Sequence, residues 1–210
     1  MIEPAFSAAT ARIVERADVA FWTHGYAAPT MATLGELCGL GRRALYYHFH
    51  SKEELFRAVL RLRNVKDQAA ADAVAEQALA RGDPAADAIG AWLDARFGDT
   101  RRRVLASPHG REINDVALHV GPDIMIEVAY VTNRQLAALV AALCAQGRLR
   151  LKPGVSAETA AMMVADGARG VNQARPPIPD NEVAARYRAI AEAILFGCAV
   201  GPSASRRRGR

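Results

Sequence analysis

The residue types best able to bind a charged partner are concentrated in the short segment Arg42–Phe49. It holds two arginines, two tyrosines and one histidine, and it contains no acidic residue. Guanidinium groups can bind phosphate oxygens or guanine edges, and phenol groups can bind phosphate oxygens or contact thymine methyls. The segment therefore predicts a surface for an acidic polymer such as nucleic acid.

A helix through this segment would turn most of these side chains outward. Leu45 and Phe49 are four residues apart, so both can anchor one face of the helix to a core. Each residue turns by about 100° around the helix axis. The other positions therefore point away from the core or flank it: Arg42, Arg43, Ala44, Tyr46, Tyr47 and His48. Lys52, just beyond the segment, adds a further phosphate donor.

Two helices are predicted before this segment. The first runs from about residue 7 or 10 to residue 24, with an apolar stripe at helical spacing and Gly25 as its stop. Thr30 can cap the second, whose inner face would carry Met31, Leu34 and Cys38. A glycine-bearing turn at 39–41 follows. Two short helices across such a turn, braced by a first helix, describe a helix-turn-helix.

The arginine pair also has a simpler interpretation, as the solvated start of a helix. Basic dipeptides are common, and cations at a helix N-terminus oppose the helix dipole. That unfavourable placement itself suggests an external anion. Taken alone, Arg42 and Arg43 would favour the interpretation as a solvated helix start.

Over residues 10–60 the sequence resembles the TetR family of bacterial transcriptional regulators. The resemblance rests on motifs at unbroken spacing: Gly25-Tyr26, Thr30-Met31-Ala32-Thr33-Leu34, Gly39-Leu40-Gly41, Ala44-Leu45-Tyr46-Tyr47-His48-Phe49 and Ser51-Lys52-Glu53-Glu54-Leu55. It implies that Arg42 and Arg43 read bases. It also implies that the DNA backbone is approached by Thr30, Ala32, Thr33, Ala44, Tyr46, His48 and Lys52. The family's usual function is repression that a small-molecule effector relieves.

Three positions depart from the family's usual pattern. Gly41 stands where Ser or Thr usually caps the recognition helix, Ala44 replaces a common Thr, and Gly35 replaces a common Ala. A missing cap and a glycine within a helix both weaken helices. We therefore expect a recognition helix that frays until DNA orders it.

The rest of the chain is also predicted to be helical, so the fold class is all-α. Ser51 and Glu54 form a capping box at the start of a long helix that ends at the break 81–84. Further helices are predicted over about 84–97, 99–106, 111–119, 122–146, 156–172 and 181–196. We expect a helix-turn-helix DNA-binding domain at 1–50, joined by the long helix to a helical effector-binding and dimerisation domain at 51–200. A disordered basic tail at 201–210 should follow.

The resemblance implies a homodimer on a near-palindromic operator, because one such module contacts too few base pairs to be specific. The last two predicted helices are the expected interface, since their apolar faces carry small residues that permit close approach. The expected interface residues are Ala161, Val164, Ala168, Tyr187, Ile190, Ala191, Ile194 and Leu195. The same residues could instead complete the core of one chain.

A small-molecule pocket in the C-terminal domain is also implied by the resemblance. Its candidate residues mix apolar and polar side chains: Trp92, Arg96, Phe97, His109, Asn114, His119, Met125, Tyr130, Asn133, Met162 and Met163. Each could equally be core or surface, because periodicity does not separate a packed core from a pocket wall. The identity of the effector is not readable from them.

Other classes of protein fit the sequence less well. We expect no enzyme and no cofactor, because a phosphate-binding glycine loop, a nucleophile elbow and a zinc-protease helix are all missing. His48 and His50 would point in different directions from a helix, which argues against a metal site. No apolar run predicts a membrane span, and no secretory signal or disulfide framework is recognisable, so a cytoplasmic location is expected.

The net charge of +5 is a poor guide to nucleic-acid binding, because four of the five charges lie at Arg206, Arg207, Arg208 and Arg210. The alternative function is that of an α-helical interaction module without specific DNA binding. Such a module would use the arginine-rich tail as its nucleic-acid or surface contact.

Overall fold

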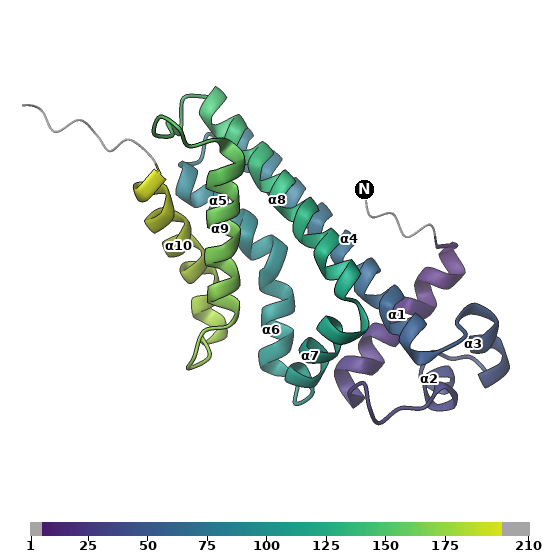
Figure 1. Ribbon diagram of the computed structural model, residues 1–210. Helices are drawn as coiled ribbons and strands as arrows, with labels where there is room; N and C mark the ends of the chain where they lie inside the picture. The colour runs from purple at the N-terminus through teal and green to yellow at the C-terminus, as the bar shows by residue number, and fades with distance from the viewer. Residues whose placement is uncertain (1–5, 199–210) are drawn as a thin grey trace, which may run out of the picture. The chain divides into compact units, whose positions relative to one another are not determined.

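The computed structural model describes residues 6–198, and most of them lie in helices (Figure 1). The tail expected at 201–210 lies outside the described residues. The α-helices are α1 (Ala8–His24), α2 (Met31–Leu37), α3 (Arg42–His48), α4 (Lys52–Arg81), α5 (Ala85–Leu93), α6 (Asp99–Ala106), α7 (Gly110–Val120), α8 (Pro122–Ala145), α9 (Ala157–Asn172) and α10 (Val183–Cys198). A π-helical segment η1 (Asp94–Gly98) precedes α6, and a 3₁₀ turn η2 (Asp180–Glu182) precedes α10. The all-α prediction is confirmed.

The chain packs as two compact units. Within the described residues, one unit holds residues 6–71 together with Ala95–Val131, and the other holds Asp72–Asp94 together with residues 132–198. The long helices α4 and α8 each contribute residues to both units. These units are defined by packing, so the functional division expected at residues 50 and 200 stays a prediction.

The first helices begin and end close to the predicted residues because the sequence supplies their caps. Gly25 ends α1 with a φ of +79°, a conformation that residues with a Cβ rarely adopt. The Ser51 Oγ accepts the N–H of Glu54 at 3.0 Å, as the capping box predicts. The Glu54 carboxylate, however, accepts the N–H of His50 at 2.7 Å, one residue before the expected donor.

An aromatic cluster forms the centre of the first unit. The Phe56 ring of α4 packs edge-on against Phe21 of α1 and against Tyr26, with ring centroids 5.1 and 5.0 Å away. Leu34 of α2 and Leu45 of α3 are fully buried in the same core. This core fixes the positions of α1, α2 and α3 relative to the start of α4.

The region from 84 to 106 differs from the prediction of two helices with a break near residue 98. Helix α5 instead continues through η1 directly into α6. Arg96 lies in this π-helical segment and is only 3% exposed. A local widening of the helix shifts the side-chain register, which a fixed 3.6-residue period does not reveal.

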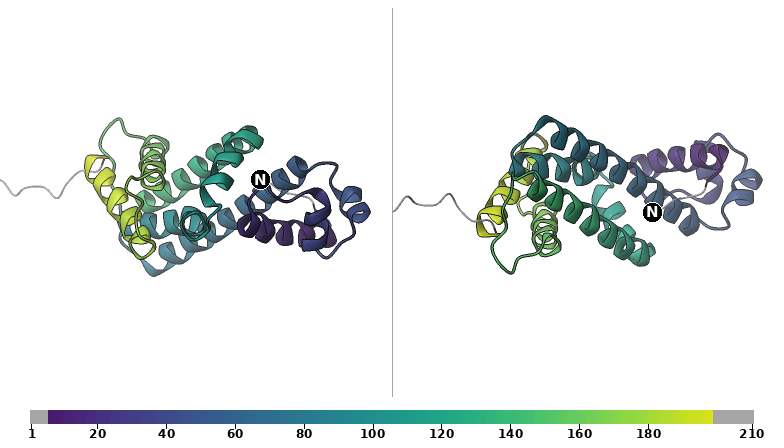
Figure 2. Two further views of the ribbon diagram at one scale, coloured as in Figure 1. Left: turned by 90° about the horizontal axis from the view of Figure 1, so that it is seen from below. Right: turned by 90° about the horizontal axis from the view of Figure 1, so that it is seen from above.

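The second unit is built around α10, which packs against α5 and α9. Glycine permits both close contacts. A Cβ on Gly90 of α5 would lie 2.8 Å from the Cα of Arg188, and a Cβ on Gly167 of α9 would lie 2.8 Å from Cγ1 of Ile190. Figures 1 and 2 both show α9 and α10 side by side.

Most of the side chains predicted for a dimer interface belong to this packing, which corrects that expectation. Six of them are at most 5% exposed within one chain: Ala161, Val164, Ala168, Tyr187, Ala191 and Leu195. The other two, Ile190 and Ile194, are half-buried against Gly167. The outward surfaces of α9 and α10 carry Met162, Met163 and Phe196 instead.

Helix α8 is long and apolar enough, by length and composition alone, to cross a membrane. The expectation that no stretch predicts a membrane span was therefore too strict. Many of its apolar side chains are buried, as expected for a core helix: Ile124, Leu136, Leu139, Val140 and Leu143.

Candidate nucleic-acid interface

Helices α2 and α3 are held together by a tight turn and by their inner faces (Figure 1). Gly39 has a φ of +73°, which satisfies the predicted need for glycine in the turn. Met31, Leu34 and Cys38 of the α2 region are at most 8% exposed, and Leu45 and Phe49 of the α3 region at most 3%. The predicted helix-turn-helix and its inner face are therefore present.

The outer face of α3 carries the side chains that the sequence placed there. Arg42, Arg43 and Ala44 are exposed, and His48 is half-buried. Tyr47 is 85% exposed and Tyr46 is 37% exposed. The seven residues of the helix include no acid, so cationic and phenolic groups face solvent without a local carboxylate.

Two contacts restrict the orientation of these side chains. The Arg42 guanidinium lies over the Tyr46 ring, 5.6 Å from its centroid. The His48 Nδ1 lies 3.4 Å from the Thr10 Oγ1 of α1, which ties the end of α3 to the first helix. These contacts reduce the number of orientations that an incoming phosphate or base would have to select.

The N-terminus of α3 lacks a side-chain cap, as the sequence predicted. Gly41 occupies the capping position, and no side chain accepts a hydrogen bond from the first turn. The free N–H groups of a first turn favour an anion. A phosphate at this end of α3 would supply the missing acceptor.

The N-terminus of α2 presents the other predicted backbone contacts. Thr30 and Thr33 are exposed and Ala32 is half-buried. The Thr30 Oγ1 accepts the N–H of Thr33 at 3.2 Å, so Thr30 caps α2 as predicted. Both hydroxyls lie on the surface, 3.0 Å apart.

Lys52 is the one predicted phosphate contact whose charged group is already engaged. Its Nζ donates to the carbonyl oxygens of Tyr26, Ala27 and Pro29 at 2.8, 3.1 and 3.2 Å. An ammonium has three donors, so a phosphate would have to replace one of these carbonyls. Its role on DNA stays a prediction.

Comparisons with known proteins agree with this geometry. Residues 13–59 match the bacterial regulatory proteins of the tetR family. TtgR, an HTH-type transcriptional regulator of Pseudomonas putida, is 46% identical over 50 residues, which are 24% of this chain and 24% of TtgR. ComR, an HTH-type transcriptional repressor of Escherichia coli, is 47% identical over 47 residues, 22% of each chain.

Residues 13–59 therefore form a segment of the TetR family. The sequence match spans about a quarter of the length of these curated relatives. Every residue proposed for the TetR-type DNA-reading surface lies within residues 13–59.

Solved structures show a similar fold over most of the chain. SmeT, the repressor of the Stenotrophomonas maltophilia multidrug efflux pump SmeDEF, matches with a TM-score of 0.64 over 91% of this chain and 90% of SmeT. The SmeT-triclosan complex matches with the same TM-score over 94% of both chains. Both are 16% identical to this chain, so they show the fold alone.

The residues predicted for an effector pocket differ widely in burial and belong to both compact units. Trp92 and Arg96 are buried, and five others are exposed: Asn114, His119, Tyr130, Met162 and Met163. The remaining four are half-buried: Phe97, His109, Met125 and Asn133. Two of the candidates, Asn133 of α8 and Met162 of α9, line one hollow of about 530 Å³ in the second unit.

A polar cluster around the buried Arg96 was only partly predicted, because the sequence analysis named Arg96 alone. Its guanidinium donates to the Asn64 Oδ1 at 3.0 Å and lies 3.9 Å from the Asp67 carboxylate. Burial raises the pKa of the Asp67 carboxyl. Asn64 and Asp67 are three apart on α4, a spacing that could have marked them as one polar face.

Proposed function

We propose that the chain is a sequence-specific DNA-binding transcriptional regulator, and a repressor that a small-molecule effector releases from its operator. The observation that carries the proposal is the exposed face of α3, which holds Arg42, Arg43, Tyr46 and Tyr47 without a single acid. The match of residues 13–59 to the tetR family supports it. We infer that the protein acts in a bacterial cytoplasm and has no catalytic function.

The proposed reading mode divides the surface into two kinds of contact. Arg42 and Arg43, at the start of α3, reach the base edges of the major groove, where a bidentate arginine recognises guanine. The other side chains hold the DNA backbone: Thr30, Ala32, Thr33, Ala44, Tyr46, Tyr47, His48 and Lys52. The uncapped N-terminus of α3 is suited to a phosphate.

Two observations support an effector in the helices beyond α4. The hollow between α8 and α9 combines Arg134 and Glu158 with an apolar wall of Ala137, Ala141 and Met162. This mixture of charged and apolar groups is typical of small-molecule sites. SmeT, which has the same fold, forms a complex with triclosan.

A homodimer would place two reading heads on a near-palindromic operator, with half-sites about one or two turns of DNA apart. The outward face of α10 carries Ala185 and Ala189, and ends at Phe196, which is 67% exposed. Met162 and Met163 of α9 are 49% and 43% exposed. We propose these outward faces, rather than the buried faces of the same helices, as the contact with a second copy.

The function is tested by selecting bound duplexes from a random DNA library with the full chain. We expect one enriched near-palindrome, which the chain binds about a thousandfold or more tightly than random duplex. A screen of small molecules against that complex should then find compounds that dissociate it. Enrichment of no sequence would reject the proposal and favour the interaction module.

A further inference from the structure

The loop that joins α1 to α2 is held by a charged side chain on each side. Residues 25–29 form this loop, and it ends at Thr30, the cap of α2. Lys52 of α4 engages its carbonyl oxygens, as described above. Glu112 of α7 engages its N–H groups, because one carboxylate oxygen, Oε1, accepts from Tyr26 at 3.1 Å and from Ala27 at 2.7 Å.

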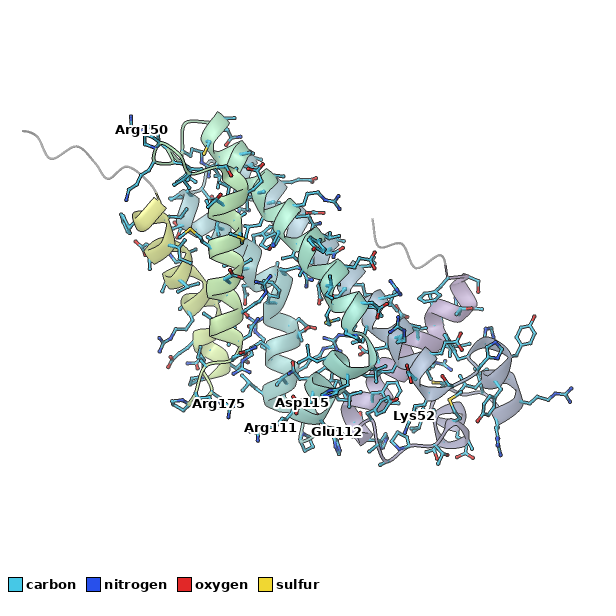
Figure 3. All side chains as sticks on the ribbon, in the orientation of Figure 1. Lys52, Arg111, Glu112, Asp115, Arg150 and Arg175 are labelled. Atoms are coloured by element: carbon cyan, nitrogen blue, oxygen red, sulfur yellow. The ribbon has the colours of Figure 1, made fainter. Side chains whose placement is uncertain are left out.

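Glu112 is the more distant of the two partners in the sequence. It lies 86 residues beyond Tyr26, on a helix that follows the π-helical segment and α6. Both Glu112 and the loop belong to the same compact unit. Figure 3 labels Glu112 and Lys52, which lie on α7 and at the start of α4.

The packing around Glu112 leaves its carboxylate little freedom. Its second oxygen, Oε2, lies 3.4 Å from Nδ1 of His109, a residue that the sequence assigned to the effector pocket. A Cβ on Gly25 would lie 2.5 Å from that same oxygen and 2.8 Å from the His109 ring. Glycine at position 25 therefore serves both the positive φ and the close approach of α7.

The turn before α7 is attached to α1 by a second contact. The Ser107 Oγ donates to the carbonyl oxygen of Trp22 at 2.7 Å and accepts the N–H of His109 at 3.1 Å. The Ser107 contact thus fixes the start of α7 against the end of α1. Glu112, on α7, holds the 25–29 loop in a position that depends on that contact. Because the loop ends at Thr30, its position determines the position of the N-terminus of α2.

We propose that Glu112 is a positioning residue for DNA binding, which acts through the 25–29 loop on the N-terminus of α2. This inference rests on the proposed function. Both N–H groups share one carboxylate oxygen, so a side chain shortened by one methylene loses both hydrogen bonds. A displacement of α7 by about 1 Å would have the same effect, since hydrogen bonds weaken beyond about 3.5 Å.

The test separates the reach of the side chain from its charge. Glu112→Asp keeps the charge and withdraws the carboxylate, whereas Glu112→Gln keeps an acceptor oxygen in place and removes the charge. Asp115→Asn, at an exposed position on the same helix, is the control for a lost negative charge. Each full-length variant is titrated with the duplex selected by the wild-type chain and with random duplex, and its unfolding midpoint is measured.

We expect Glu112→Asp to bind the selected duplex about tenfold more weakly, a typical size for coupling between sites. Glu112→Gln should stay within about threefold of the Asp115→Asn control. If Glu112 acts only as a charge that repels phosphates, Gln tightens binding and Asp leaves it unchanged. That pattern, or equal binding by all variants, overturns the inference.

Amide exchange provides a second measurement, made on the wild-type chain and on Glu112→Asp. In the folded wild-type chain the N–H groups of Tyr26 and Ala27 should exchange slowly, and in Glu112→Asp they should exchange faster without a matching fall in the unfolding midpoint. Rapid exchange in the wild-type chain contradicts the inference. Failure of the wild-type chain to select any duplex instead rejects the proposed function, and the positioning role falls with it.

Discussion

Arg42 and Arg43 are adjacent and were predicted to have the same base-reading role, but their surroundings in the structure differ. Arg42 stacks on Tyr46, while Arg43 is exposed and is not paired with any residue in the range 6–198. A stacked guanidinium is held in one region of space, whereas a free one can adapt to a base edge. Arg43 is therefore the sharper test of base reading.

Replacement of Arg43 by Ala should remove discrimination between sequences. We expect a loss of about 1 to 3 kcal/mol per half-site on the selected duplex and little change on random duplex, as measured by titration at constant salt. Arg111→Ala, at an exposed arginine of α7, is the control for a lost positive charge. Equal losses on both duplexes would mean that Arg43 contacts phosphate rather than a base.

Gly35 shows how far single residues could be interpreted from the sequence. From the sequence, Gly35 was expected to lower the stability of α2, since Ala favours helices more than Gly. In the structure Gly35 is buried, and a Cβ there would lie 3.1 Å from the Leu40 carbonyl oxygen. The close approach of the turn explains the glycine, and no local pattern predicts such a contact.

At the scale of helices, the sequence predicted most boundaries because caps and stops are local. Thr30 and Ser51 each accept a backbone N–H three residues later, as the sequence led us to expect, and Ser156 caps α9 in the same way. The π-helical segment at 94–98 and the buried face of α10 were not predicted, because both depend on contacts with distant residues. Burial of Arg96 against Asn64 is such a contact.

Gly110, at the start of α7, should not tolerate a side chain. A Cβ there would lie 2.1 Å from the Val104 carbonyl oxygen, so Gly110→Ala forces α6 and α7 apart. We expect a loss of about 3 kcal/mol in the free energy of unfolding, measured with denaturant. Gly170→Ala, where a Cβ meets nothing within 4 Å, should instead gain up to about 1 kcal/mol. Similar effects at both glycines would contradict the described turn.

The contact between α4 and α8 should weaken in acid. Two hydrogen bonds from the Arg57 guanidinium, of 2.8 and 2.6 Å, lower the pKa of the Asp123 carboxyl to about 2. A lowered pKa means that the stabilisation is present above the ordinary Asp pKa near 4 and is lost as the pH falls towards about 2. The unfolding midpoint of Asp123→Asn should therefore fall less steeply over that range than that of the wild-type chain. Parallel curves would show that the pair contributes nothing.

At the scale of the whole molecule, the sequence predicted that the last two helices carry apolar faces but not which face meets the chain's own core. The buried face of α10 carries Val183, Tyr187 and Leu195, and such an apolar face could pack against the same chain or against a second copy. Gly90 of α5 and Gly167 of α9 allow these helices to approach α10 closely, and this packing buries that face within one chain. Positions of this kind are recognisable only once the partner helix is known.

The dimer proposal predicts the effect of a charge on the outward face of α10. Phe196→Glu should convert a dimer into a monomer, as measured by sedimentation at micromolar concentration, because an unpaired carboxylate is costly at an apolar interface. Leu118→Glu is the control, since Leu118 is similarly exposed at 56% but lies on α7. A wild-type chain that sediments as a monomer would reject the dimer itself.

Removal of residues 203–210 distinguishes the regulator from the interaction module. The deletion takes away four arginines, so affinity for random duplex should fall and its dependence on salt should become shallower. Binding of the selected duplex should persist, because the proposed reading surface lies within residues 13–59. Complete loss of selective binding would favour the module.

The uncapped start of α3 also has a consequence for the time that the protein needs to find its target. A seven-residue helix without a cap is only weakly stable by itself. At non-specific sites we therefore expect α3 to contact the duplex only briefly, without binding stably in the major groove. Brief encounters permit rapid sliding along the chromosome. Long residence would then begin only where the correct bases and phosphates complete the helix.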